Sequence, residues 1–125
     1  METPKKDKNP PLWFTCFHGL ALSNNYRAMF YDYLKEKGLP KIEIKITGVD
    51  QLYRISDFRD KIKSAKVIVD LLPKNSGPLV NGKFLESKDF APNAKILYYD
   101  QIPMKKNKEY CMNKIYEFYL NAIKK

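Results

Sequence analysis

Short apolar runs alternate with helical patterns along this chain, and that alternation limits the folds open to it most strongly. Strands that are separated by helices pair in parallel, because right-handed crossovers place the helices over the faces of the sheet. The predicted strands cover residues 12–16, 41–47, 67–72 and 95–99, and the predicted helices cover residues 24–37, 56–64 and 107–123. We therefore expect a three-layer α/β fold, a four-stranded parallel sheet of order 2-1-3-4 with helices on both faces.

Size and composition indicate one α/β domain over residues 11–125. The chain has 125 residues, of which 44% are hydrophobic and 14% aromatic, enough for a buried core. Residues 1–10 are polar, Lys-rich and contain proline, so we expect a flexible basic arm there. That arm lacks the apolar core of a signal peptide, and no apolar stretch is long enough to span a bilayer, so we expect a cytoplasmic protein without a membrane span.

Local patterns place the strands and their ends. Residues 67–72 form a nearly continuous apolar run, which predicts a central strand covered on both faces. Residues 41–47 alternate strictly between apolar and polar, which is typical of a half-exposed or edge strand. Gly38 is placed to end the first helix, and Asn81-Gly82 is a turn signal.

A cysteine stands where the first predicted strand leads into the first predicted helix. Cys16 ends the apolar run that begins at Leu12. A loop that opens a helix points backbone N–H groups inward, and the helix dipole adds positive charge, so such a loop binds anions and lowers a thiol pKa. We predict that the loop contains Phe17, His18, Gly19, Leu20, Ala21, Leu22 and Ser23, with Ser23 also the N-cap of the helix.

The pattern Cys16-x5-Leu22-Ser23, followed at once by a helix, resembles the low-molecular-weight protein tyrosine phosphatases. In that family a strand ends in Cys-x5-Arg-Ser. The resemblance implies a phosphatase-I-like fold, with Cys16 in the place of the nucleophile and Ser23 in that of the loop serine. It also implies that Asp100 takes the place of the general acid of an Asp-Pro motif, in which Gln101 replaces the proline.

Leu22 stands in the place of the family's essential arginine. That arginine contacts the phosphoryl oxygens with two N–H groups and stabilises the transition state, which leucine cannot do. Loss of one such donor lowers the rate by roughly a hundredfold to a thousandfold. The resemblance therefore implies a degenerate relative that binds an anion or a phosphorylated partner at residues 16–23, with weak or no phosphatase activity. Arg27 and His18 are the nearby side chains that could compensate for Leu22.

Two other functions stay open. The segment from Cys16 to Ser23 is also similar to the cysteine loop of the IIB components of sugar phosphotransferase systems, which share this fold and need no arginine. That similarity implies thiol phosphotransfer through a phosphocysteine at Cys16. The third reading is a non-catalytic basic interaction module, since the net charge of +9, from 23 Lys and Arg against 14 Asp and Glu, favours acidic partners.

The composition also limits the classes of ligand and partner that we expect. We expect a phosphate-containing ligand or phosphoprotein, and we do not expect nucleic acid, because the chain has no recognisable RNA or DNA motif. We expect no cofactor and no metal, since one histidine and two distant cysteines form no ligand set. Two cysteines, Cys16 and Cys111, fit a reducing compartment better than a disulfide scaffold.

Overall fold

The computed structural model describes residues 9–17, 21–103 and 107–124. Most of the predicted arm, residues 1–8, lies outside these ranges. The elements in chain order are β1 (Leu12–Cys16), α1 (Ala21–Glu36), β2 (Ile44–Gly48), α2 (Val49–Arg54), α3 (Ser56–Ile62), β3 (Val67–Asp70), β4 (Leu79–Val80), β5 (Lys83–Phe84), α4 (Ser87–Phe90), β6 (Lys95–Leu97), the 3-10 helix η1 (Tyr99–Gln101) and α5 (Lys108–Ile123). In the described part of the chain, no helix has the length and apolarity that crossing a membrane requires.

The four long strands form one parallel sheet in the order β2-β1-β3-β6. Strand β6 is the fourth strand predicted from the sequence, so the expected parallel sheet and its order are confirmed. In the central strand β1, Leu12 pairs with Ile44 of β2 and with Val67 of β3. The continuous apolar run became the central strand β3, and the alternating run became the edge strand β2.

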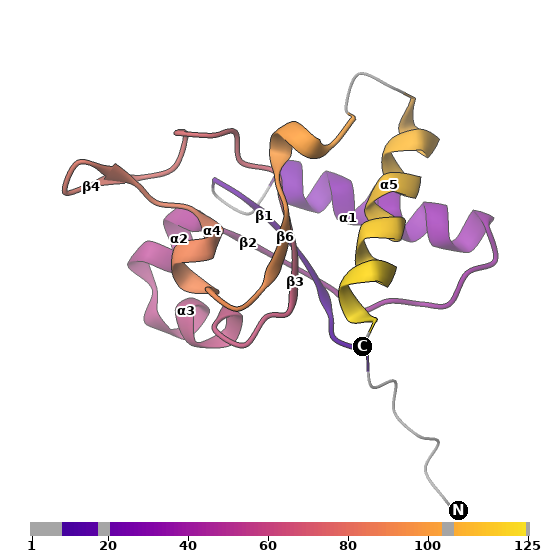
Figure 1. Ribbon diagram of the computed structural model, residues 1–125, viewed down its shortest axis with the longest axis horizontal. Helices are drawn as coiled ribbons and strands as arrows, with labels where there is room; N and C mark the ends of the chain where they lie inside the picture. The colour runs from indigo at the N-terminus through magenta and orange to yellow at the C-terminus, as the bar shows by residue number, and fades with distance from the viewer. Residues whose placement is uncertain (1–8, 18–20, 104–106, 125) are drawn as a thin grey trace, which may run out of the picture.

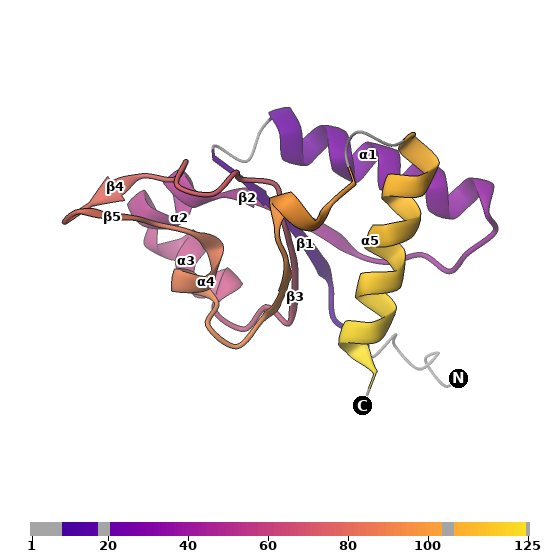
Figure 2. The ribbon, with the colours of Figure 1, turned by 45° about the horizontal axis from the view of Figure 1, so that its top comes forward.

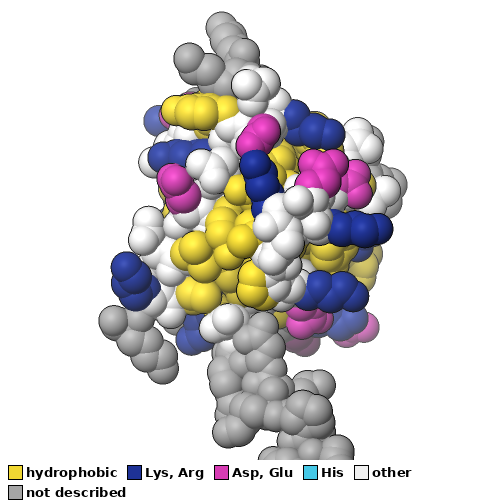
Figure 3. Space-filling model, turned by 90° about the vertical axis from the view of Figure 1, so that its right-hand side faces the viewer, with side chains coloured by type: hydrophobic (Ala, Val, Ile, Leu, Met, Phe, Trp, Pro, Cys, Tyr) yellow, Lys and Arg dark blue, Asp and Glu magenta, His cyan; other side chains and the backbone are white. Residues whose placement is uncertain are grey.

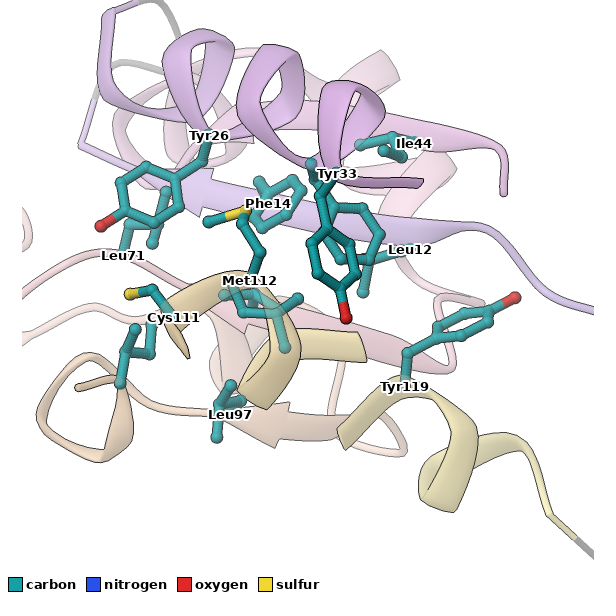
Figure 4. Close-up of a cluster of buried hydrophobic side chains, with 14 of the residues drawn as sticks. Leu12, Phe14, Tyr26, Tyr33, Ile44, Leu71, Leu97, Cys111, Met112 and Tyr119 are labelled. Carbon is teal, nitrogen blue, oxygen red and sulfur yellow. The ribbon is translucent and has the colours of Figure 1, made fainter. Parts of the chain in front are cut away.

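Each face of the sheet has its own buried cluster, because successive side chains of a strand point to opposite sides. On one face Leu12 and Phe14 pack with residues of α1 and α5, Tyr33 and Met112 among them (Figure 4). On the other face Trp13 packs with residues of α2, α3 and α4, Leu52 among them. The sheet is therefore the middle layer, with α1 and α5 on one side and the shorter helices on the other (Figure 1).

Helix α1 begins and ends for identifiable reasons. At its end Gly38 adopts φ +67°, and the N–H of Leu39 donates to Leu34 O at 2.9 Å, as in a Schellman motif. The predicted C-cap at Gly38 is thus confirmed. The start differs: α1 begins at Ala21, so Ser23 lies inside its first turn and the predicted N-cap role of Ser23 is wrong. Alanine and leucine are strong helix formers, which favours extension of the helix over residues 21 and 22.

Between β3 and β6 the chain forms a hairpin of β4 and β5 that projects away from α5 (Figure 2). The predicted turn at Asn81-Gly82 joins its two strands, and both residues have positive φ, +51° and +78°. These values fit a type I′ turn, whose twist matches that of paired strands. The hairpin brings Phe84 back toward the sheet, where it forms part of the cavity described below.

Candidate functional site

The carboxyl ends of β1 and β3 mark the switch point of the sheet. From β1 the chain continues to β2 on one side, whereas β3 lies on the other side and leads to β6. Open parallel sheets bind ligands at such a point, because the connections leave the sheet in opposite directions and a crevice opens between them. Cys16 ends β1 and Asp70 ends β3, so both reach this edge.

The predicted anion-binding loop is partly described. Cys16 is buried, with 6% of its surface exposed, and belongs to the cluster under α1 and α5. The carbonyl of Phe17 accepts a hydrogen bond from the N–H of Asp50 at 2.9 Å, which fixes the start of the loop to the beginning of α2. His18, Gly19 and Leu20 lie outside the described residues, and α1 begins at Ala21.

Leu22 and Ser23, in the first turn of α1, face different surroundings. The side chain of Leu22 is 38% exposed, whereas Ser23 is fully buried. Among the described residues, the Oγ atom of Ser23 has no hydrogen-bond partner. Arg27, which could replace the missing loop arginine, donates from Nη2 to Asn24 Oδ1 at 2.7 Å on its own helix. A buried hydroxyl without a partner is costly, so the Ser23 hydroxyl is the polar group at this helix end that a ligand can satisfy.

Neither cysteine forms a disulfide, and both thiols lie in the same buried cluster. Cys111 lies in α5 beside Tyr26 of α1 (Figure 4). Burial raises the pKa of the Cys111 thiol, an effect that a hydrogen bond with Tyr26 opposes. Burial is also the largest cause that raises the pKa of Tyr26 to about 12. This pair is therefore protonated at neutral pH and contributes to the core.

A buried polar network occupies the opposite face of the sheet. Thr15 and Asp70 pair across β1 and β3, and Thr15 Oγ1 donates to Asp70 Oδ1 at 3.3 Å. The same hydroxyl lies 2.7 Å from Ser87 Oγ at the start of α4. The N–H of Leu72 also donates to Asp70 Oδ1, at 3.0 Å. Burial raises the pKa of Asp70 to about 6, although these hydrogen bonds oppose the rise.

Asp70 opens into a cavity of about 410 Å³. The cavity lies between the end of β3, the loop that follows β3, the end of β5 and the segment around η1. Its charged and aromatic lining residues are Asp70, Lys74, Phe84, Glu86, Tyr98, Tyr99 and Asp100. The predicted general acid Asp100 is thus exposed at this cavity. Of the described residues, Cys16 is not among those that line it, so the pairing of Asp100 with Cys16 stays a prediction.

Sequence patterns alone did not identify Asp70 or the cavity. Asp70 was counted within an apolar run, because five of the six residues from 67 to 72 are apolar. A carboxylate near the end of such a run was the available signal, since acidic residues are almost never fully buried unless they are paired. Glu86 and Phe84 gave no comparable signal, because only the hairpin brings them to the end of β3.

The described residues form no metal-ligand cluster, and the comparisons with known proteins assign no family. The described ranges contain no group of three or more His, Cys, Asp or Glu residues placed to hold a metal ion. Comparison of the chain with protein-family models, curated proteins and solved structures gives no match. The resemblance to the phosphatases and to the IIB components therefore stays a prediction.

Proposed function

We propose that this protein binds phosphate, or a phosphate group on a partner, at the loop from Cys16 to Ser23, and that it has weak or no phosphatase activity. The observation that carries the proposal is the fully buried Ser23 hydroxyl, which has no hydrogen-bond partner among the described residues. It lies in the first turn of a 16-residue helix. The free N–H groups and dipole of such a helix end attract an anion, and the Ser23 hydroxyl adds a donor.

The surroundings support binding more than catalysis. Leu22 supplies no positive charge, and Arg27 is engaged with Asn24 on the surface of α1. The carboxylate expected to protonate a leaving group, Asp100, lines a cavity of which Cys16 is not part. A phosphate bound here would accept hydrogen bonds from backbone N–H groups and one hydroxyl. The described residues of the loop supply no side-chain cation. Binding of this kind is weak and salt-sensitive.

The basic surface offers less support for an interaction module. Several Lys and Arg residues pair with carboxylates: Lys37 with Glu109, Lys83 with Asp89, and Arg54 with Asp50. On the face shown in Figure 3, Lys and Arg side chains are scattered around an apolar centre, with Asp and Glu between them. We further infer a reducing, cytoplasmic setting, which two cysteines that form no disulfide support.

Titration with inorganic phosphate, followed by the backbone amide signals in NMR spectra, tests the binding site. The amides of residues 17–23 should shift first. Ser23→Ala should weaken binding about tenfold, because it removes a hydrogen bond to a charged group. It should also raise the free energy of unfolding by about 1 kcal/mol, since a buried hydroxyl without a partner disappears. Ser64→Ala, at an exposed serine, is the matched control and should change neither quantity.

Three outcomes contradict the proposal. If the largest shifts fall on the Lys-rich arm and α5, the basic interaction module replaces it. If a phosphoryl donor leaves a covalent phosphate on Cys16, thiol phosphotransfer replaces it. If the protein turns over an aryl phosphate as fast as an intact phosphatase and Cys16→Ser abolishes that turnover, the protein is an enzyme. Leu22→Arg should raise a low turnover, because residue 22 is exposed enough to accept the longer side chain.

A further inference from the structure

The cavity beside Asp70 is electronegative, although the whole chain is basic. Among the described residues that line it, Asp70, Glu86 and Asp100 carry carboxyl groups and Lys74 carries the one ammonium group, so these residues have a net charge of −2 when all are ionised. The net charge of the chain is +9. The pKa of Tyr98 also reflects this local field, since burial first and then the charges of Glu86 and Asp70 raise it. The cavity therefore disfavours the phosphate that the Cys16 loop attracts.

Among the described residues, the cavity does not have the ligands of a metal site, since no group of three or more acidic, His or Cys side chains converges. Instead a single carboxylate, that of Asp70, lies buried with 2% of its surface exposed. Glu86 lines the same cavity, and its charge adds to the rise in the pKa of Asp70, of which burial is the largest cause. A compact cation placed between these two groups relieves the repulsion and pairs the buried carboxylate.

The rest of the lining suits a carbon skeleton. Phe84 and Tyr98 supply aromatic surface, and Leu72 and Leu85 supply aliphatic surface. Aromatic rings attract ammonium groups through their electron-rich faces, in addition to packing against apolar groups. A volume of about 410 Å³ holds a ligand of small-molecule size. A cavity with a buried carboxylate at one end and aromatic side chains in its walls is complementary to an organic amine.

We propose that this cavity binds a small primary amine, with its ammonium group against Asp70 and Glu86 and its carbon skeleton beside Phe84 and Tyr98. This site is independent of the phosphate-binding loop. Thr15 pairs with Asp70 and directs its side chain to the α4 face, whereas the next residue, Cys16, packs under α1 and α5. Cys16 and Asp70 therefore share an edge of the sheet, and their side chains lie on opposite faces.

The test compares three probes that share one ring: benzylamine, benzyl alcohol and benzoate. At about pH 7.5 most Asp70 side chains are ionised, since the pKa is about 6. Titration followed by amide NMR should give saturable shifts with benzylamine, largest near Gly77, Leu85 and Gln101. Benzyl alcohol should bind at least about tenfold more weakly, because it forms no charge-assisted contact, and benzoate more weakly still.

Variants separate this site from non-specific attraction. Asp70→Asn should weaken benzylamine about tenfold and remove the preference over benzyl alcohol. Asp100→Asn, at the exposed rim of the cavity, should cause a smaller loss of benzylamine affinity. This variant tests the effect of a carboxylate charge without altering a buried group. Asp32→Asn, on the exposed surface of α1, makes the same charge change elsewhere and should have no effect. Equal binding of benzylamine and benzyl alcohol, absence of saturable binding, or largest shifts outside the cavity each overturn the proposal.

Discussion

Asp70→Asn should make the stability of this protein depend less on pH. The native pKa of Asp70 is about 6, against an ordinary value of 3.8, so between these values the folded protein keeps a proton that the unfolded chain has released. The contribution of Asp70 is therefore fully present below pH 3.8 and is lost as the pH rises through about 6. A rise of about two pKa units, at about 1.4 kcal/mol each, amounts to about 3 kcal/mol.

Urea unfolding measures this effect, with the fluorescence of Trp13 as the signal, since Trp13 is the one tryptophan and is buried. Near pH 4 a protonated Asp70 resembles asparagine, whereas near pH 7.5 the wild-type protein buries a charge that the variant lacks. The stability of Asp70→Asn relative to wild type should therefore rise by about 2.5 kcal/mol between these pH values, somewhat less than the full effect because the unfolded chain is already partly ionised at pH 4. Asp32→Asn controls for general charge effects. A relative stability that stays within about 0.5 kcal/mol across this range refutes the reasoning.

Two other predictions concern the core and the cavity wall. Iodoacetamide at neutral pH should alkylate Cys16 faster than Cys111, because burial raises the pKa of the Cys111 thiol whereas Cys16 precedes a helix N-terminus. Peptide mass spectrometry measures the alkylation of each cysteine separately. Faster alkylation of Cys111 contradicts the predicted loop. Gly77→Ala should lower the free energy of unfolding in urea more than Gly82→Ala does. A Cβ atom at Gly77 would lie 1.9 Å from Leu85 O, whereas at Gly82 the only cost is the strain of a positive φ. Equal losses of unfolding free energy in the two variants contradict this close approach.

The sequence predicted the sheet because each of its strands has a strong local signal. The apolar run in β3 and the alternation in β2 fix which strand is central and which is at the edge, and the crossover rule then sets the order. The turn at Asn81-Gly82 was also predictable, since these residue types tolerate positive φ. Helix α2 was not predicted, because six residues give too short a pattern to define an apolar stripe.

The candidate sites were harder to predict because they depend on contacts between distant segments. Cys16 was identified from its own strand and helix, yet the buried state of Ser23 depends on where α1 begins. The cavity needs Asp70 from β3, Glu86 from the hairpin and Tyr98 from the end of β6, and no local pattern joins these three. The strand order alone places Asp70 beside β1, but the course of the hairpin determines which residues line the cavity together with Asp70.

The two proposed sites use neighbouring residues of strand β1, whose side chains point to opposite faces of the sheet. Thr15 faces the polar network of Asp70 and Ser87, and Cys16 faces the core under α1. The side chains of Cys16 and Asp70 therefore reach the same edge of the sheet from opposite faces. Consequently, Ser23→Ala should weaken phosphate binding and leave amine binding unchanged, whereas Asp32→Asn, which lies in neither site, should leave both ligands unaffected.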